Sequence, residues 1–412
     1  MSDRTFDAII AGAGPAGLAT ALYLLRRRPD LRGRVAAIEK ARHPRPKTCA
    51  GGLIPKTMLA LRELEIALDV PHVEVMRGTA HTPIGGDVDM FRGDALCTVI
   101  RRDEFDALLA RAAREAGLEL VENTRVLGIE QDSGSVRVTT DGGTFESAIV
   151  VGADGSGSRV RTSVFGQRKE SIGRALMTDV PAAAAPEFIE RRYIFDFRCV
   201  AAGVGGYSWA FPCLIDGRPH LNVGIYEQRP RHDGSNGAVQ SSDNKLLFDQ
   251  LCASFPGFGL DRIGRREMPF KSFPIRWFDP SDRYVERRVI LAGDAAGVDP
   301  LMGEGISTAF EHGRLAAGAI ADFLDGKADA LKRYDAELHR SAIGRKLEKL
   351  AFAARSFYGP HYRAFFRIAM VSRSAQAIGV DWFNGSAHLD ELSTPTLLAR
   401  WARAILFNTP VR

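Results

Sequence analysis

The sequence has no uninterrupted apolar run that approaches the ~20 residues of a membrane-spanning helix. Its first residues read as a strand, where a secretory signal would need a longer apolar segment. We therefore expect a cytoplasmic protein. Cysteine is scarce as well. The five cysteines lack CxxC spacing and are odd in number, which indicates neither a metal site nor a disulfide framework.

A concentrated basic face is also missing. The net charge of +5 is spread along 412 residues without a cluster of basic and aromatic positions, so nucleic acid is a poor candidate partner. A membrane surface or an anionic substrate stays open. With 45% hydrophobic and 25% charged residues the composition is that of an ordinary globular protein. Its length predicts roughly two or three domains of ~100–200 residues each.

The strongest motif lies near the N-terminus. An apolar run at residues 8–11 ends at Gly12, and Gly14 and Gly17 then open a helical pattern. This order is typical of a dinucleotide-binding unit. The first glycine permits the tight turn, the second lets the main chain approach a pyrophosphate, and the third lets the helix pack against the strand. The phosphates would sit at the helix N-terminus.

The end of the next expected strand supports that interpretation. Residues 35–38 are apolar and are followed by Glu39, whose carboxylate suits a ribose 2′-OH. The same carboxylate disfavours NADP at this place, because it would repel a 2′-phosphate. The motif leaves FAD and NAD both open, and a purely structural glycine turn is the competing interpretation.

The rest of the chain predicts a mixed architecture. Helical patterns occupy residues 56–68, 102–116 and 305–324. Strand-like runs occupy residues 118–121, 124–130, 134–140, 148–151 and 289–292, with short β-like runs between 73 and 91. The middle alternates aromatic and β-branched runs with loops, so we expect a mostly β region there.

The expected fold class is α/β (α+β), with a discontinuous Rossmann-like nucleotide-binding domain. That domain would comprise residues 1–70, 95–165 and 286–328. An inserted β-sheet substrate domain would comprise residues 71–94 and 166–285, and a C-terminal helical region residues 329–412. The last region is basic and rich in aromatics. We expect a capping helical subdomain, with a lipid-contacting surface as the alternative.

Three separated segments together resemble flavoproteins of the hydroxylase type, which hold FAD in such a discontinuous domain. They are residues 12–17 with Glu39, residues 152–161, and residues 293–305. The resemblance implies that Asp294 holds the ribityl chain and that the following glycine turn faces the flavin. The implied FAD contacts are Gly12, Gly14, Pro15, Ala16, Gly17, Glu39, Lys40, Arg102, Val126, Asp154, Gly155, Gly293, Asp294, Pro300, Gly303, Gly305 and Ile306.

Within that superfamily the sequence looks most like the geranylgeranyl reductase family. Residues 47–53 are similar to its Lys-x-Cys-Gly-Gly loop, although Ala50 stands where a glycine is usual. Residues 207–212 match its Tyr-x-Trp-x-Phe-Pro motif. Residues 102–106 resemble its Arg-x-x-Phe-Asp helix start, which implies that Arg102 reaches the FAD.

These segments also supply candidate site residues. Cys49 and Lys47 are the candidate catalytic pair, because a basic, glycine-rich setting lowers a thiol pKa; an inert loop thiol is the alternative. The candidate substrate contacts are Tyr207, Trp209, Phe211, Gly51 and Gly52. Strand alternation puts the three rings on one face, as it would for an ordinary β-core. We expect His43 and Lys56 to be solvated.

The resemblance implies an FAD-dependent oxidoreductase that reduces carbon–carbon double bonds of a prenyl chain with hydride from reduced flavin. One alternative is a flavin monooxygenase or halogenase, although a halogenase would want a Trp-x-Trp-x-Ile-Pro stretch that residues 207–212 do not match. Another is a flavin-bearing binding or electron-transfer protein. The expected partner is a polyprenyl or lipid-like molecule, with peripheral membrane contact left open. An external reductant, NADPH or another donor, is expected, but no second nucleotide motif identifies it.

Overall fold

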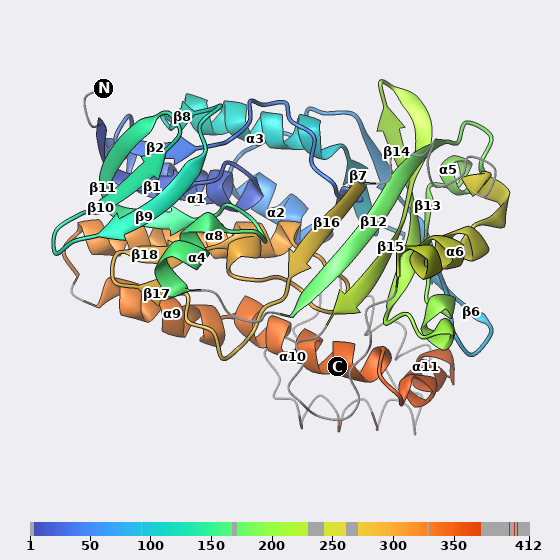
Figure 1. Ribbon diagram of the computed structural model, residues 1–412. Helices are drawn as coiled ribbons and strands as arrows, with labels where there is room; N and C mark the ends of the chain where they lie inside the picture. Colours follow the sequence, from blue (N-terminus) through green and yellow to red (C-terminus); the bar gives the residue numbers. More distant parts are fainter. Residues whose placement is uncertain are drawn as a thin grey trace.

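Two large β-sheets, each with its own helices, make up most of the molecule (Figure 1). The computed structural model describes residues 4–91, 93–166, 171–229, 243–260, 271–327 and 329–371, together with residues 395, 399 and 402. A nucleotide-type sheet lies at one end, a mostly antiparallel sheet lies at the other, and the C-terminal helices run below both. The expected mixed α/β class is confirmed.

The first sheet has eight strands and gathers three separate parts of the chain. Its main path is β17-β18-β11-β1-β2-β8, and β10 and β9 extend from β11. β1 pairs in parallel with β2 and β11, and β11 pairs in parallel with β18. The strands are β1 (Arg4–Ala11), β2 (Val35–Ile38), β8 (Glu119–Val121), β9 (Val126–Gln131), β10 (Val136–Thr140), β11 (Gly143–Gly152), β17 (Val285–Glu286) and β18 (Val289–Leu291). The expected discontinuous, Rossmann-like sheet is therefore confirmed.

The helices α1 (Pro15–Arg27) and α8 (Ile306–Leu324) lie beside one another next to this sheet. They approach closely because Gly313 faces α1; a Cβ there would lie 2.8 Å from the Ala19 Cβ. The other helices of the first 166 residues are α2 (Pro55–Glu63), α3 (Arg102–Glu115) and α4 (Arg159–Phe165). The first expected helix ends earlier than the predicted residue 68, because Glu65 takes a left-handed φ of 59° that stops the helix.

The second sheet has seven strands in the order β16-β12-β15-β14-β13-β5-β6. All neighbours pair antiparallel except β13 and β5, which are parallel. The strands are β5 (Arg77–His81), β6 (Asp87–Phe91), β12 (Ile172–Pro181), β13 (Arg192–Asp196), β14 (Gly206–Ile215), β15 (Arg218–Arg229) and β16 (Lys271–Arg276). A small third sheet is formed by β3 (Gly52–Leu53), β7 (Cys97–Ile100) and β4 (His72–Val75).

The two faces of the second sheet carry different cores. Tyr207, Trp209 and Phe211 lie in an aromatic cluster on one face, and Ala210 of the same strand lies in an aliphatic cluster on the other. The aliphatic cluster includes Leu247 of α6 (Asn244–Ser254), which covers that face. The predicted alternation of β14 is therefore confirmed, and one sheet face is left for a site.

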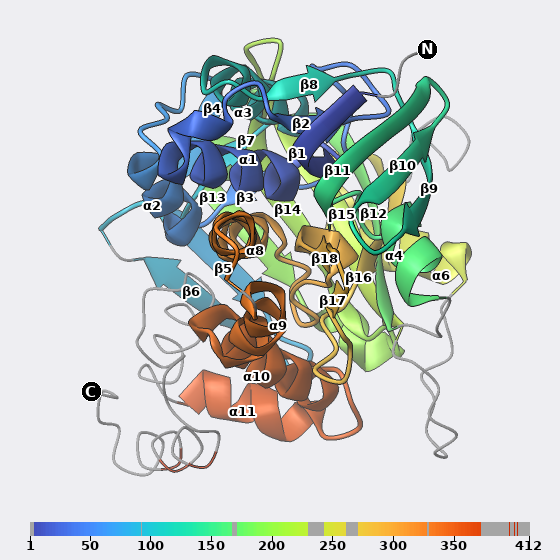
Figure 2. The same ribbon diagram turned by 90° about the vertical axis from the view of Figure 1, so that its left-hand side faces the viewer.

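In the described residues up to 371, α8 is followed by α9 (Ala330–Arg340), α10 (Ala342–Phe357) and α11 (Tyr362–Val371) (Figure 2). Shorter helical pieces are α5 (Pro186–Ile189), η1 (Pro29–Leu31), η2 (Arg198–Ala202), η3 (Pro256–Phe258) and η4 (Gly293–Ala295). Most of the expected helical residues after 371 lie outside the described part of the chain. Among the described helices, none combines the length and the apolar character that crossing a bilayer requires.

Candidate active site

One cavity of about 600 Å³ joins the two sheets. Its lining begins at the carboxyl ends of the parallel strands, where α/β proteins bind nucleotides, and it continues onto the aromatic face of β14. Most candidate site residues line it: Gly12, Gly14, Pro15, Ala16, Glu39, Lys40, Lys47, Cys49, Gly51, Gly52, Arg102, Val126, Asp154, Gly155, Tyr207, Trp209, Phe211, Asp294, Gly303, Gly305 and Ile306. The structure therefore brings the proposed cofactor and substrate residues into a single space.

Three candidates lie behind this lining. A Cβ on Gly17 would be 2.0 Å from the Gly12 carbonyl oxygen, so this glycine lets α1 pack on the turn, as its position in the motif predicts. Gly293, at φ +60°, has the same role toward Ala16, whose Cβ would be 2.5 Å away. The Pro300 carbonyl faces the second sheet and accepts hydrogen bonds from its side chains. These residues support the site without lining the cavity.

The glycine turn leaves an open place at the start of α1. A Cβ on Gly14 would meet only the Arg45 Nη2, at 3.6 Å. Gly14 is the N-cap of α1 and provides no side-chain cap, so the first N–H groups of the helix have no side-chain acceptor. An anion such as a pyrophosphate satisfies such groups and is favoured by the helix dipole.

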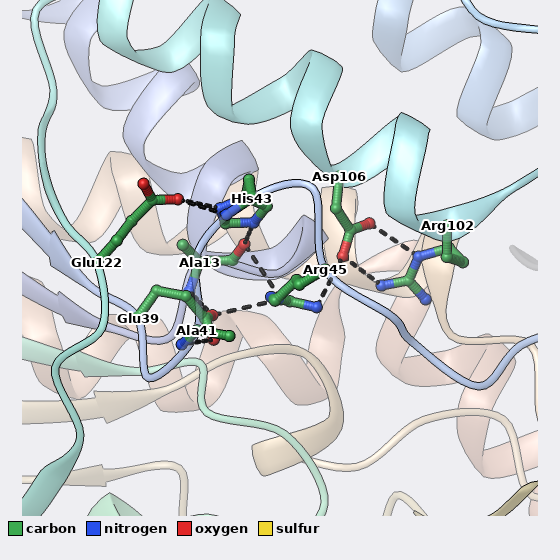
Figure 3. Close-up of polar contacts among 8 residues, drawn as sticks. All are labelled: Ala13, Glu39, Ala41, His43, Arg45, Arg102, Asp106 and Glu122. Carbon is green, nitrogen blue, oxygen red and sulfur yellow. Dashed lines mark hydrogen bonds and ion pairs between the residues drawn. The ribbon is translucent and has the colours of Figure 1, made fainter.

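Glu39 is held in place by main-chain N–H groups (Figure 3). Its Oε2 accepts from Ala13 N at 3.0 Å, and its Oε1 accepts from Ala41 N at 3.2 Å. Arg45 Nη2 donates to the same carboxylate at 3.3 Å. The side chain is buried at the end of β2 and lines the cavity. A carboxylate fixed in this way retains lone pairs for a ribose hydroxyl.

A buried ion-pair network lies beside Glu39. Arg102 donates to both carboxylate oxygens of Asp106, at 2.8 and 3.0 Å, and Arg45 Nη1 lies 3.3 Å from one of them (Figure 3). Burial opposes the charge on Arg102, but Asp106, assisted by Cys49, outweighs it and raises the pKa of the guanidinium. Arg102 therefore stays a fixed positive charge at the cavity wall, as an FAD contact requires.

No sequence pattern indicated a role for Arg45, and the expectation that His43 is solvated is wrong. The His43 side chain is only 2% exposed; its ring lies 2.7 Å from a Glu122 oxygen and 3.1 Å from the Ala13 carbonyl oxygen (Figure 3). Glu122 follows β8, far along the chain, so no local pattern reveals this pairing. Arg45 and His43 fix the segment after Glu39 against the glycine turn, because both contact the Ala13 carbonyl oxygen.

The Lys47–Gly52 loop connects the two halves of the cavity. The Lys47 Nζ lies 3.0 Å from the centroid of the Phe273 ring, a cation–π contact. Burial, with the positive charge of Arg102, lowers the pKa of Lys47 to about 8, although Asp294 and Cys49 oppose the shift. Cys49 is partly buried, and its Sγ accepts from Gly51 N at 3.4 Å.

The glycines of this loop are needed for close approach. Gly51 has φ +82°, and a Cβ there would lie 2.0 Å from the Ile100 carbonyl oxygen of β7. A Cβ on Gly52 would be 3.2 Å from the Phe211 ring. Ala50, the departure from the family pattern, needs no positive φ and packs against the aromatic cluster. The loop therefore tolerates alanine at that position.

Asp154 and Asp294 differ in what their carboxylates do. Asp154 accepts from Ser158 Oγ at 2.5 Å and from Arg159 N at 2.6 Å, so it organises the first turn of α4. Burial raises its pKa. Asp294 accepts one weak bond, from Ser156 Oγ at 3.3 Å, and lines the cavity. Asp294 is therefore the better placed of the two to accept from a flavin hydroxyl.

The apolar half of the cavity is an aromatic wall, formed by Tyr193, Phe195, Tyr207, Trp209 and Phe211. Neighbouring rings contact one another; the Phe195 and Phe211 centroids are 5.4 Å apart, edge to face. Phe195 pairs with Trp209 across β13 and β14. The sequence predicted the β14 rings. It placed β13 only within a mostly β region, because the pairing that brings Tyr193 and Phe195 to this wall is not local.

Trp209 is held in the aromatic wall by a polar partner and by close contact with a glycine. Its indole N–H donates to Asn222 Oδ1 at 2.8 Å, and Asn222 donates in turn to Asp179 at 2.7 Å. The ring passes over Gly224, where a Cβ would lie 2.2 Å from it. Satisfied polar partners and a glycine beneath the ring fix the plane of the indole.

Comparisons with known proteins agree with this geometry. The family described as FAD binding domain matches residues 5–206. Digeranylgeranylglycerophospholipid reductase of Methanocella arvoryzae is 28% identical over 369 residues, covering 84% of this chain and 85% of that protein. Geranylgeranyl diphosphate reductase of Rhodobacter capsulatus is 28% identical over 343 residues, covering 79% and 78%.

A solved structure supports the fold. A geranylgeranyl bacteriochlorophyll reductase-like protein from Thermoplasma acidophilum superposes with a TM-score of 0.74 at 20% identity, covering 97% of this chain and 96% of that one. The residues present fit FAD, since the uncapped helix start, the fixed Glu39 carboxylate and the available Asp294 carboxylate lie along one cavity. The chain is thus an FAD-dependent oxidoreductase that is similar to the geranylgeranyl reductases.

Proposed function

We propose that the protein uses reduced FAD to saturate carbon–carbon double bonds of a prenyl chain. The observation that carries this proposal is the single cavity, in which the nucleotide cradle opens directly onto the aromatic wall. Each ring of such a wall can bury ~150–250 Å², which suits a long chain without polar groups. The two named reductases among the relatives act, by their names, on geranylgeranyl compounds.

The chemistry divides between cofactor and protein. When bound, reduced FAD supplies the hydride. The aromatic wall holds the alkene and excludes water from it, which an unactivated double bond needs for productive orientation. The second hydrogen must arrive as a proton.

Lys47 and Cys49 are the proposed proton-handling pair at the junction of the two halves. With a pKa of about 8, the Lys47 ammonium can both hold and release a proton near neutral pH. Cys49 lies on the same loop and interacts electrostatically with Lys47 and with Arg102. The glycine contacts of the loop with Ile100 and Phe211 keep both side chains beside the aromatic wall.

The remaining parts of the proposal concern the electron donor of the flavin and the location of the protein in the cell. An external donor, NADPH or another reductant, would reduce the flavin. We also propose a cytoplasmic protein with peripheral membrane contact, through which it reaches a lipid-like substrate. This is supported by Phe352, which is 51% exposed on α10. The test is co-sedimentation of the protein with anionic vesicles, which Phe352→Ser should weaken. Equal co-sedimentation of the variant and the wild type would contradict a membrane contact through Phe352.

The function is tested by turnover. The purified holoprotein is reduced with dithionite under nitrogen and incubated in separate reactions with a prenyl diphosphate, a prenylated quinone or a polyprenyl glycerolipid. The product masses are then measured by mass spectrometry. We expect gains of two hydrogens per reduced double bond. Trp209→Ala should raise KM for long chains more than for short ones, because the ring forms part of the wall. Absence of hydrogenated product from every substrate class would overturn the proposal.

The alternative is a monooxygenase, since the flavin fold serves many chemistries. A hydroxylase of small phenols must orient a hydroxyl group, and the aromatic wall offers few groups for that. Tyr207 directs its hydroxyl to Met302 O, and Trp209 directs its N–H to Asn222. A product that gains oxygen in air, with oxygen consumed in step with substrate, would favour the monooxygenase.

A further inference from the structure

Trp209 ends a chain of hydrogen bonds that crosses three strands of the second sheet and reaches α3. Arg101 Nη1 donates to both carboxylate oxygens of Asp179, each at 3.1 Å. Asp179 also accepts from Asn222 Nδ2 at 2.7 Å, and Asn222 Oδ1 accepts from the indole N–H of Trp209 at 2.8 Å. Asp179, Asn222 and Trp209 come from the adjacent strands β12, β15 and β14 (Figure 1). Arg101 is the N-cap of α3 and directly precedes Arg102.

The donor and acceptor types in this chain of hydrogen bonds permit one arrangement. A guanidinium and an indole only donate, and a carboxylate only accepts. The amide of Asn222 lies between the Asp179 carboxylate and the Trp209 N–H, so its nitrogen must face the carboxylate and its oxygen must face the indole. Asn222 Nδ2 also donates to the Met177 Sδ at 3.7 Å. Asp179 therefore sets the orientation of the amide, and through it the acceptor that Trp209 meets.

The indole has little freedom while this acceptor is present. Gly224 lies opposite Trp209 on β15, and a Cβ there would be 2.2 Å from the ring. Trp209 and Asn222 are both buried, and an N–H that loses its acceptor inside a protein is costly. If the Asn222 amide lost its orientation, the indole would be driven to another position. Because Trp209 lines the cavity, the shape of the aromatic wall would change with it.

We propose that Asn222 and Asp179 are positioning residues that set the preference of the cavity for long chains through the orientation of the Trp209 indole. This rests on the proposed function, because it takes the aromatic wall as the surface that binds the prenyl chain. A chain that spans the whole wall contacts the indole, whereas a short chain can occupy the part formed by the other rings. Asn222 and Asp179 are not among the described residues that line the cavity, so both act through Trp209.

Fluorine NMR of the holoprotein labelled with 5-fluorotryptophan tests the positioning without any substrate. The chain has four tryptophans, and Trp209→Phe identifies the resonance of Trp209 as the one that disappears. We expect Asn222→Leu and Asp179→Asn to shift this resonance and to broaden or split it. Leucine at position 222 removes the acceptor, and asparagine at position 179 lets the Asn222 amide turn, so in both variants the indole has more than one orientation.

Kinetics with prenyl compounds of increasing length test the effect on specificity. Asn222→Leu should raise KM for long chains about five- to tenfold, because binding must then order the indole, and should change KM for short chains and kcat by less than about twofold. In the Trp209→Phe background, Asn222→Leu should add no further change in KM. The N–H that Asn222 serves is then gone, and a double-mutant cycle reports this loss of coupling.

Glu227→Gln is the matched control. Glu227 accepts from Arg174 at 2.9 Å across the same two strands, β12 and β15, and its side chain is fully buried. Glu227 and Arg174 are not among the described residues that line the cavity. This variant should lose stability but keep the Trp209 resonance and the chain-length preference of the wild type.

A Trp209 resonance that stays unchanged in both Asn222→Leu and Asp179→Asn would overturn the inference. An unchanged chain-length preference, or an equal change in Glu227→Gln, would overturn it as well, because the polar residues would then only support packing. Should Asn222→Leu fail to fold, Asp179→Asn, at a partly exposed position, decides by the same criteria. If the wild type reduces no prenyl compound, the proposed function and the chain-length preference both fail, and the fluorine spectrum still decides the positioning.

Discussion

Replacing Asp106 by asparagine removes the charge that neutralises two buried guanidinium groups. Asp106 is fully buried and accepts two hydrogen bonds from Arg102, while Arg45 lies within ion-pair distance. Asparagine keeps the shape but offers one acceptor oxygen and turns two N–H donors toward cationic donors. Arg102 and Arg45 would then keep their charge with no full counter-charge at Asp106.

The expected cost follows from burial. Removing one partner of a buried ion pair costs about 3–5 kcal/mol, because the remaining charge has neither water nor counter-ion. We expect the lower end of that range, since asparagine retains one acceptor and Arg45 also contacts Glu39. FAD affinity should fall as well, because the orientation of Arg102 at the cavity wall depends on both Asp106 oxygens.

Urea denaturation of the FAD-free protein gives the loss of unfolding free energy, and quenching of FAD fluorescence gives the dissociation constant. Glu119→Gln is the control: Glu119 pairs with Arg4 at 2.8 Å, but both side chains are nearly half exposed. Such a pair contributes only about 0–1 kcal/mol. If Asp106→Asn changes neither quantity more than Glu119→Gln does, the importance assigned to the buried network is refuted.

Three further predictions concern single positions. Gly14→Val should abolish FAD retention without unfolding the protein, because a Cβ there meets little protein, whereas Gly17→Val should disrupt the fold itself. Circular dichroism measures the fold and flavin content measures FAD retention. Equal loss of structure in both variants would contradict the different roles given to the two glycines. Cys49→Ser should keep the flavin spectrum and occupancy but lower turnover, and unchanged turnover would reduce Cys49 to a packing residue. His312 accepts from Gly293 N, and burial lowers its pKa to about 4 from 6.5. Because the unfolded chain takes up the proton first, the stability conferred by neutral His312 is complete above pH 6.5 and is lost as the pH falls toward 4, by roughly 3 kcal/mol. His312→Gln should reduce the pH dependence of the unfolding free energy between pH 6.5 and 4. An unchanged slope of unfolding free energy against pH would exclude this histidine as its cause.

Local patterns were sufficient for much of the fold. Apolar strands that end in Gly12, Gly152 and Gly293 predicted that three separate parts of the chain share a sheet, because each junction has the same chemistry. The alternation of β14 predicted that Tyr207 and Trp209 share a face. In both cases the information lies within a few residues, where sequence periodicity is direct evidence of structure.

Contacts between distant segments could not be predicted in this way. His43 was expected in solvent and is buried, because its partner Glu122 follows a strand that only the sheet brings near. Arg45 lies in a Pro-rich loop that gave no sign of its contacts with Glu39 and Asp106. Tyr358 donates to the Leu301 carbonyl from the end of a helix without any motif. Each of these depends on tertiary packing that a single sequence does not encode locally.

A single-turnover experiment tests the central claim most directly. The flavin is reduced stoichiometrically under nitrogen, freed of excess reductant and mixed with a polyprenyl substrate, while flavin absorbance and product mass are followed together. The account predicts that the flavin is reoxidised without oxygen and that one double bond gains two hydrogens per flavin. A flavin that stays reduced until oxygen is admitted, and then yields an oxygenated product, would contradict it.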